Sequence, residues 1–323
     1  MEKKLDVTAL GELLIDFTGN GESGQGNPLF EANPGGAPCN VLSMLTRLGK
    51  KTAFLGKVGN DMFGKLLKER VTKEGVDVTG LFFDEEIPTT LAFVQTFENG
   101  DRDFSFYRKP GADLCLTKEE VEQSRDLIEA SKLFHFGTLS LTADPAETAT
   151  KQAISIAKEA GCLISFDPNY RPPLWESEER AKEMIWYGIG QCDILKISDN
   201  EITFLTGETD YEKGIERILE HKKIPVVFAT LGPDGSMAFC DGKVTKKAGF
   251  RNPDTIETTG AGDTFMACAL NGVLEAEKLS FSETELDRIL TFSNAAASII
   301  TTRRGALSVM PTKQEVEEFL RQS

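Results

Sequence analysis

Short runs of consecutive apolar residues recur along the chain and alternate with longer segments of helical periodicity. The apolar runs lie at residues 7–10, 52–58, 133–136, 163–166, 194–197 and 226–231. Runs of this length are typical of strands that are buried on both faces of a parallel sheet. Apolar positions recur every three or four residues in the segments at 40–48, 62–74, 146–160, 178–187 and 211–220. These segments are therefore predicted helices.

This alternation predicts an α/β fold in which helices cover both faces of a mostly parallel sheet. No internal repeat, low-complexity stretch or Pro/Gly/Ser-rich linker divides the 323 residues. We therefore expect a single domain over residues 1–323.

Two segments break the alternation and predict a small antiparallel sheet. Apolar runs at 13–17 and 29–33 flank a glycine-rich stretch, and an alternating run at 89–97 leads through Asn99-Gly100 into residues 103–108. Asn-Gly is the strongest short signal for a β-hairpin. We expect a sheet formed by residues 13–33 and 89–110 to project from the body. It could be a stabilising edge, a dimer surface or a lid that excludes water from a cleft.

Composition and charge exclude several classes of protein. A hydrophobic content of 40% and a charged content of 27% are ordinary for a soluble globular chain. The net charge of −15 and the pI of about 4.8 disfavour nucleic acid or an anionic membrane as a partner. Nothing near the start resembles a signal peptide, and no apolar stretch is long enough to span a membrane. We expect a cytoplasmic protein.

Cysteine and histidine offer no catalytic or metal centre. The six cysteines lie far apart without a CxxC pair, which suits a reducing compartment. His135 lies in a strand-like run, and we interpret it as structural. His221 ends a predicted helix, where positive charge is favourable.

Three glycine motifs are candidates for ligand binding. The GxGxxG match at residues 19–24 is not followed by a helix, so it lacks the helix N-terminus that a dinucleotide site needs, and no Walker-type motif is present. The motif at residues 34–40 directly precedes a helix. On the residues alone it is a helix-entry turn, although Asn40 offers both a donor and an acceptor there.

The third motif, which ends at Asp263, carries the strongest signal. The N–H groups of Gly260, Ala261 and Gly262 open a predicted helix and would form an anion hole. An aspartate in a first helical turn can simply complement the helix dipole. A carboxylate beside an anion hole is also what phosphoryl transfer to an alcohol requires, because it accepts the hydroxyl proton. An ordinary aspartate pKa of about 4 would leave Asp263 ionised at neutral pH.

Two motifs together resemble the signatures of the ribokinase-like (phosphofructokinase B type) carbohydrate kinases. One covers residues 35–40 and continues at 56–61, and the other covers residues 258–265. They occur in the family's order and at its separation, and the resemblance spans nearly the whole chain. It implies an ATP-dependent sugar kinase with a three-layer α/β/α body, a mostly parallel central sheet and a small antiparallel β lid.

The resemblance also implies site residues. Asp263 would be the general base, and the anion hole would be formed by the amides of Gly260, Ala261 and Gly262. The sugar would be held by Asp16, Gly35, Gly36, Asn40, Arg108 and Arg171. ATP would be bound by Lys196, Thr230, Gly232, Gly235 and, near the adenine, Asn294.

Two cation sites are implied in the same way. Mg²⁺ would be organised around Glu201, largely through water, as this ion prefers. A monovalent cation such as K⁺ would be bound, mostly through carbonyls, by Glu257, Thr259, Ile300, Arg303 and Gly305. Two positions depart from the family pattern: Ser198 stands where Asn is common, and Glu257 stands where many relatives carry Asp.

The stretches at 9–17, 35–38, 107–113 and 196–198 are similar to bacterial fructokinases, which implies conversion of D-fructose and ATP to D-fructose 6-phosphate and ADP. The closest alternative is a 2-keto-3-deoxygluconate kinase, whose substrate carboxylate would need Arg108 and Arg171 together as a clamp. Ribose or nucleoside kinase activity is more distant. A non-catalytic sugar-binding protein is disfavoured, since Asp263 keeps its glycines. A homodimer through exposed edge strands of the lid stays open.

Overall fold

The computed structural model describes residues 3–96 and 102–323, whose strands form two sheets. The larger sheet has nine strands in the order β13-β12-β11-β10-β9-β8-β1-β4-β5. Neighbouring strands from β11 to β5 pair in parallel, and β12 and β13 add an antiparallel edge. The strands are β1 Leu5–Leu10, β4 Thr52–Gly59, β5 Asp77–Asp84, β8 Ser131–Gly137, β9 Leu163–Asp167, β10 Ile194–Ser198, β11 Val226–Thr230, β12 Ser236–Cys240 and β13 Lys243–Lys247.

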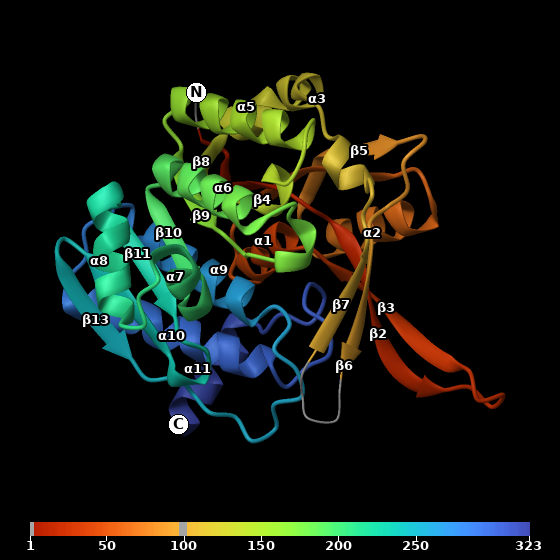
Figure 1. Cartoon of the computed structure of the whole chain (residues 1–323). Helices are drawn as coiled ribbons and strands as arrows, with labels where there is room; N and C mark the ends of the chain where they lie inside the picture. Colours follow the sequence, from red (N-terminus) through yellow and green to blue (C-terminus); the bar gives the residue numbers. More distant parts are fainter. Residues whose placement is uncertain (1–2, 97–101) are drawn as a thin grey trace.

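Helices cover both faces of this sheet (Figure 1). One layer consists of α1 Ala37–Arg47, α2 Met62–Lys73, α9 Ala261–Ala276, α10 Glu283–Ile300 and α11 Lys313–Gln322. The other consists of α3 Lys118–Gln123, α4 Arg125–Glu129, α5 Ala146–Glu159, α6 Glu178–Gln191, α7 Asp199–Thr206 and α8 Tyr211–His221. Each layer packs its apolar side chains into its own buried cluster against the sheet. This three-layer α/β/α arrangement confirms the predicted fold class.

The six predicted apolar runs all fall on strands of the larger sheet. Every residue of β4 is buried, because helices cover the strand on both faces and leave no polar side to alternate. No helix in the described residues is long and apolar enough to cross a bilayer.

The second sheet has four strands in the order β3-β2-β6-β7 and projects from the body (Figure 1). Its strands are β2 Leu14–Glu22, β3 Pro28–Gly35, β6 Leu91–Thr96 and β7 Arg102–Tyr107. The two hairpins are antiparallel, as predicted. The β2–β6 pair that joins them is parallel, because both strands leave the body in the same direction.

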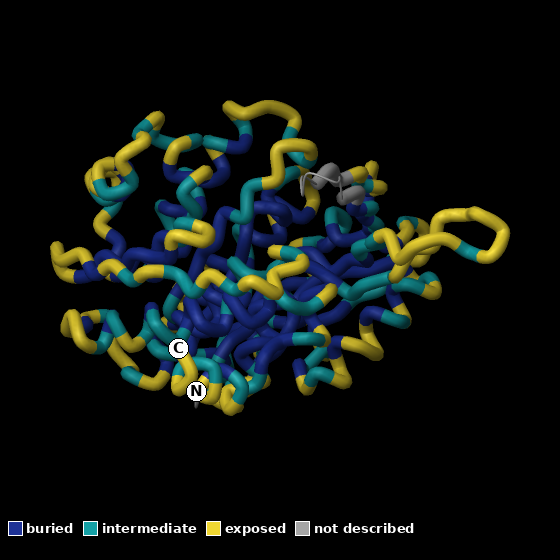
Figure 2. Tube along the Cα trace, turned by 90° about the horizontal axis from the view of Figure 1, so that it is seen from below, coloured by how far each residue is buried: buried dark blue, intermediate teal, exposed yellow. Residues whose placement is uncertain are grey.

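The far end of the β2–β3 hairpin is exposed (Figure 2). In the main sheet, by contrast, β4 and β12 are buried throughout. The GxGxxG match lies in this hairpin, and a strand rather than a helix follows it. As expected, the motif is not followed by a helix N-terminus. The predicted Asn99-Gly100 turn lies outside the described residues.

Candidate active site

A cavity of about 950 Å³ lies where the carboxyl ends of β10 and β11 meet the first turns of α1 and α9. This edge of a parallel sheet is the usual ligand site of open α/β folds. Most of the predicted site residues line it: Asp16, Gly36, Asn40, Arg171, Lys196, Glu201, Thr230, Gly232, Gly235, Thr259, Gly260, Ala261, Gly262, Asp263 and Asn294. The predicted residues outside the lining, within the part of the chain that the structure describes, are Gly35, Arg108, Glu257, Ile300, Arg303 and Gly305.

The start of α9 needs a glycine. Gly260 has a φ of 75°, and a Cβ there would lie 2.7 Å from the Cβ of Ala306. None of the described side chains caps this helix. The Ala261 N–H donates to the Thr258 carbonyl (3.2 Å), which leaves Gly262 and Asp263 as the first-turn donors without a cap. The positive end of the helix dipole therefore opens onto the cavity.

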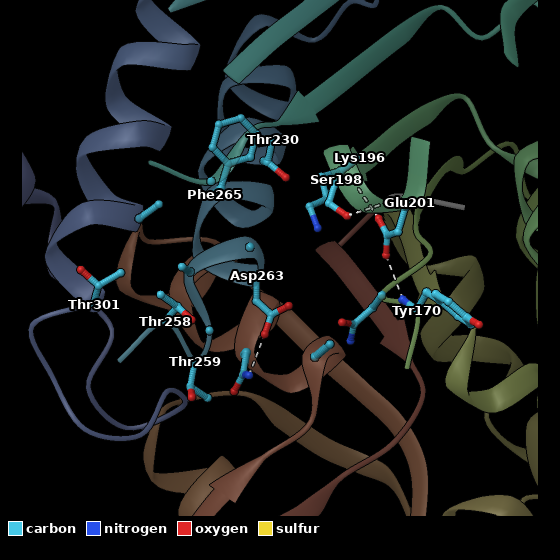
Figure 3. Close-up of a pocket in the computed structure, with 18 of the residues that line it drawn as sticks. Tyr170, Lys196, Ser198, Glu201, Thr230, Thr258, Thr259, Asp263, Phe265 and Thr301 are labelled. Carbon is cyan, nitrogen blue, oxygen red and sulfur yellow. Dashed lines mark hydrogen bonds between the residues drawn. The ribbon is translucent and has the colours of Figure 1, made fainter. Parts of the chain in front are cut away.

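Asp263 points into the cavity from the first turn of α9 (Figure 3). Asn40 Nδ2 donates a hydrogen bond of 2.8 Å to Asp263 Oδ2. Burial raises the pKa of Asp263, while this hydrogen bond and the charges of Lys196 and Arg171 oppose the rise. The net pKa is raised, so the ordinary value expected from the sequence is wrong. A raised pKa makes the carboxylate a stronger proton acceptor.

Asn40 is held at the start of α1 by an unusual turn. Gly36 precedes this helix with a φ of 123°, and a side chain there would collide with the carbonyl of Glu12. An ionised carboxylate only accepts hydrogen bonds, so Asn40 must turn its nitrogen to Asp263. Asn40 Oδ1 is then buried without a partner in the described part of the chain. Such an orphaned acceptor is costly unless a ligand donates to it.

Asp16 also lines the cavity. Burial raises the pKa of Asp16 to about 7; Arg171 lowers it, and the charges of Glu257 and Asp263 add to the rise. Gly35 leaves room for Asp16, because a Cβ at this glycine would collide with Asp16 Oδ2.

Arg108 does not reach the cavity. Its guanidinium pairs with Asp113 at 2.6 Å and donates to the Leu139 carbonyl at 2.8 Å, and the side chain is 2% exposed. Arg171 lines the cavity. The structure therefore does not bring Arg108 and Arg171 together as a clamp.

Neutral groups dominate the opposite end of the cavity. Thr230, Gly232 and Gly235 lie at the turn between β11 and β12. Asn294, on α10, accepts a hydrogen bond from the Ser236 hydroxyl (2.9 Å) and donates to the Ala248 carbonyl (3.2 Å). Both ends of its amide are thus occupied within the protein.

Comparison with known proteins identifies the family of the chain. The family model described as "pfkB family carbohydrate kinase" matches residues 4–313. The chain belongs to the pfkB family of carbohydrate kinases. It is accordingly a sugar phosphotransferase.

The curated relatives and solved structures agree. Fructokinase-2 of Solanum lycopersicum is 40% identical over 98% of this chain and 96% of its own length. Probable fructokinase-6, chloroplastic, of Arabidopsis thaliana is 41% identical over 97% of this chain and 82% of its own length. The ATP-bound fructokinase of Xylella fastidiosa has a TM-score of 0.89 at 27% identity and covers 100% of this chain and 99% of its own. The Vibrio cholerae fructokinase with fructose, ADP and calcium has a TM-score of 0.86 at 30% identity and covers 98% and 99%.

In this pfkB-family kinase, Glu201 has a structural task as well. Its two carboxylate oxygens accept the N–H groups of Tyr170 and Ser198, each at 2.8 Å (Figure 3). Ser198, one of the two departures from the family pattern, caps α7 in a capping box with Glu201. Among the described residues, no group of three or more acidic, histidine or cysteine side chains could hold a metal ion.

The predicted monovalent-cation residues gather beside the cavity, and of them only Thr259 lines it among the described residues. Glu257 Oε1 accepts the Gly305 N–H at 2.8 Å, so this carboxylate joins the two backbone segments. The Arg303 guanidinium donates to the Val309 carbonyl at 2.9 Å.

Two acids at the site were not predicted. Glu12 lines the cavity and accepts the Ala37 N–H at 2.8 Å, and burial raises its pKa to about 7. Asp167 ends β9 and pairs with Lys196. An acid at the end of a predicted strand was the signal for Asp167, because the carboxyl ends of parallel strands form the site.

Proposed function

We propose that the protein is an ATP-dependent fructokinase, which converts D-fructose and ATP to D-fructose 6-phosphate and ADP. One observation carries this proposal: Asp263 is buried in the cavity, held by Asn40, beside the uncapped start of α9. The names of the relatives agree with fructose as the acceptor.

The geometry supports direct transfer to a sugar hydroxyl. Asp263 takes the proton of the hydroxyl, whose oxygen then bonds to the γ-phosphorus of ATP while the bond to the ADP oxygen breaks. The uncapped amides at the start of α9 and the Lys196 ammonium stabilise the charge on the transferred group. Asp16 accepts from neighbouring hydroxyls, and Asn40 Oδ1 supplies a further acceptor.

Magnesium fits this site only through its waters and the phosphates. The Glu201 carboxylate lines the cavity, but each oxygen already accepts a backbone N–H, and the described residues form no metal cage. Glu201 would therefore hold Mg²⁺ through water. When bound, Mg²⁺ neutralises phosphate charge; one structural neighbour, from E. coli, is described in complex with ATP and Mg²⁺.

The position of Arg108 favours fructose over 2-keto-3-deoxygluconate. The keto acid carries a carboxylate that would call for two arginines, and Arg108 is committed to Asp113. Fructose carries no charge, so side chains that accept hydrogen bonds from its hydroxyls, such as Asp16, are sufficient to bind it.

The proposal can be tested by coupled ADP-release assays with fructose, 2-keto-3-deoxygluconate, ribose and glucose. We expect fructose to give the highest kcat/KM. Turnover with the keto acid alone would overturn the choice of sugar. Repeating the fructose assay in K⁺ and in a large organic cation tests the monovalent cation at Glu257 and Gly305, since we expect K⁺ to raise the rate.

The four-stranded sheet is proposed as a lid within a single domain covering residues 1–323, and its edges as a dimer surface. β3 and β7 are the edge strands, and Leu29, Phe30 and Tyr107 are 45%, 48% and 66% exposed. Exposed edges and apolar groups are suited to pairing with a second copy. Light scattering should detect a dimer that Phe30→Asp dissociates, and a wild-type monomer would contradict this. A cytoplasmic location also remains a proposal.

A further inference from the structure

A buried ion pair lies directly behind the cavity. Lys196, on β10, and Asp167, at the end of the neighbouring strand β9, are paired with Nζ–Oδ2 at 3.0 Å and Nζ–Oδ1 at 3.1 Å. Their side chains are 7% and 4% exposed. Lys196 lines the cavity, and Asp167 does not. The aspartate therefore reaches the cavity through the lysine and through the Asn169 N–H, which donates to Asp167 Oδ1 at 3.2 Å.

The lysine ammonium lies against the anion hole. A Cβ built on Gly262 would be 3.2 Å from Lys196 Nζ, so this glycine keeps the space beside the ammonium open. An ammonium has three donors, and Asp167 can occupy two of them, which leaves at least one for a ligand. A transferred phosphoryl group bound at the start of α9 would meet both the helix amides and this donor.

Lys196 has competing partners inside the site. Burial lowers its pKa, but the charges of Asp167, Glu201 and Asp263 outweigh burial, so the pKa is raised and the lysine stays protonated. Of these three acids, Asp167 alone forms an ion pair with Lys196 in the described part of the chain. If Asp167 were neutral, the ammonium would be drawn toward Asp263, and an ion pair there would disable the base.

We propose that Asp167 is a positioning residue for phosphoryl transfer: it holds the Lys196 ammonium beside Gly262, against the transferred group, and away from Asp263. This inference rests on the proposed role of Lys196 at the phosphates. It does not depend on which sugar is the acceptor.

A double-mutant cycle of Asp167→Asn and Lys196→Met tests this, with the sugar that the wild-type enzyme phosphorylates best. We expect Asp167→Asn to lower kcat about 100-fold with the sugar KM within about twofold, since positioning affects the transition state rather than sugar binding. The double variant should have the kcat of Lys196→Met within about twofold, because Asp167 acts only by positioning the Lys196 ammonium. Glu147→Gln, which loosens a largely buried pair with Lys151 and Arg180 outside the cavity lining, is the matched control and should keep wild-type kcat.

Unfolding of the ligand-free variants provides a second readout. Asp167→Asn leaves Lys196 buried and unpaired and should unfold at a lower denaturant concentration. The double variant should regain the stability that Asp167→Asn loses, because it removes the unpaired charge. Recovery of stability without recovery of kcat supports positioning. Recovery of both in the double variant, wild-type kcat in Asp167→Asn, or a double variant more than tenfold slower than Lys196→Met would each overturn the inference. Failure of the fructokinase proposal is seen separately, in the choice of sugar by the wild-type enzyme.

Discussion

The two ends of the cavity use different chemistry. The proposed sugar end holds the buried acids Glu12, Asp16 and Asp263, whose pKa values are all raised. The proposed nucleotide end includes Thr230, Gly232, Gly235 and Asn294, whose amide already bonds to Ser236 and Ala248. The first end thus offers carboxylate acceptors, whereas the Asn294 amide at the second is already hydrogen-bonded within the protein. Ser298, which also lines the cavity from α10, has a buried hydroxyl without a partner among the described residues.

The difference predicts where the enzyme is selective. A buried acceptor left without its hydroxyl costs binding energy, so the sugar end should reject analogues that lack a hydroxyl. A satisfied polar group loses nothing when a different base is bound. The nucleotide end should therefore select for phosphate and shape rather than for the base.

The largest effect should come from removing the base at the sugar end. Asp263→Asn keeps the shape of the side chain but cannot accept the hydroxyl proton, so we expect kcat to fall by about 10³ to 10⁴-fold. Sugar affinity measured by calorimetry should stay within about threefold. Glu283→Gln, in the first turn of α10 and outside the cavity lining, is the matched control. Near-wild-type turnover of Asp263→Asn would remove Asp263 from the mechanism.

Asp16→Asn should raise the sugar KM by about 100-fold, because the carboxylate accepts from two hydroxyls and the amide from fewer. The ATP KM should change little, and an equal rise in both constants would argue against two distinct ends.

The same variant should be more stable than the wild type at pH 8. The pKa of Asp16 is raised to about 7 from an ordinary value of about 4. Folded protein therefore binds more protons between these values, and the stability contributed by the protonated acid is lost as pH rises through 7. Denaturant unfolding at pH 5 and pH 8 should show a larger gain for Asp16→Asn at pH 8 than at pH 5. If Asp16→Asn were less stable than the wild type at pH 8, the ionised Asp16 carboxylate would not destabilise the folded protein, and the account would be contradicted.

Asn40→Ala should have an intermediate effect of about tenfold on kcat, since it removes one hydrogen bond from the base. Without this bond the pKa of Asp263 rises further, and the acidic limb of kcat/KM should move to higher pH by about one unit. A pH–rate profile that keeps its wild-type acidic limb would show that Asn40 does not act on Asp263.

The smallest effect should be the change of nucleotide base. Because both ends of the Asn294 amide are engaged, we expect kcat/KM for GTP within about tenfold of that for ATP. A preference for ATP over GTP of more than about 100-fold would show that residues other than Asn294 recognise the base.

The sequence predicted the parallel body well, because strands buried on both faces leave uninterrupted apolar runs. β13 was missed because it is an edge strand with three lysines among its five residues. α10 was also missed, although its capping box at Ser282 and Glu285 is a readable start signal.

The motifs correctly placed Asn40, Asp263 and the glycines Gly36, Gly260 and Gly262 at one cavity, because each motif sets a local turn before a helix. Arg108 was predicted to bind sugar, but a partner five residues ahead, Asp113, occupies it, and spacing along the chain does not reveal this. The pairing of Asp167 with Lys196 joins neighbouring strands. This pairing depends on the order of strands in the sheet, which cannot be read from a single sequence.

The central claim is that the acceptor hydroxyl of the sugar lies between the Asp263 carboxylate and the γ-phosphate bound at the amides of the first turn of α9. A crystal structure with fructose and a non-hydrolysable ATP analogue tests it most directly. We expect the C6 hydroxyl oxygen of fructose within about 3.2 Å of Asp263 Oδ1, the oxygen to which Asn40 does not donate. The same hydroxyl should face the γ-phosphorus. A sugar whose nearest carboxylate is Asp16, with Asp263 out of hydrogen-bond reach of every hydroxyl, would contradict it.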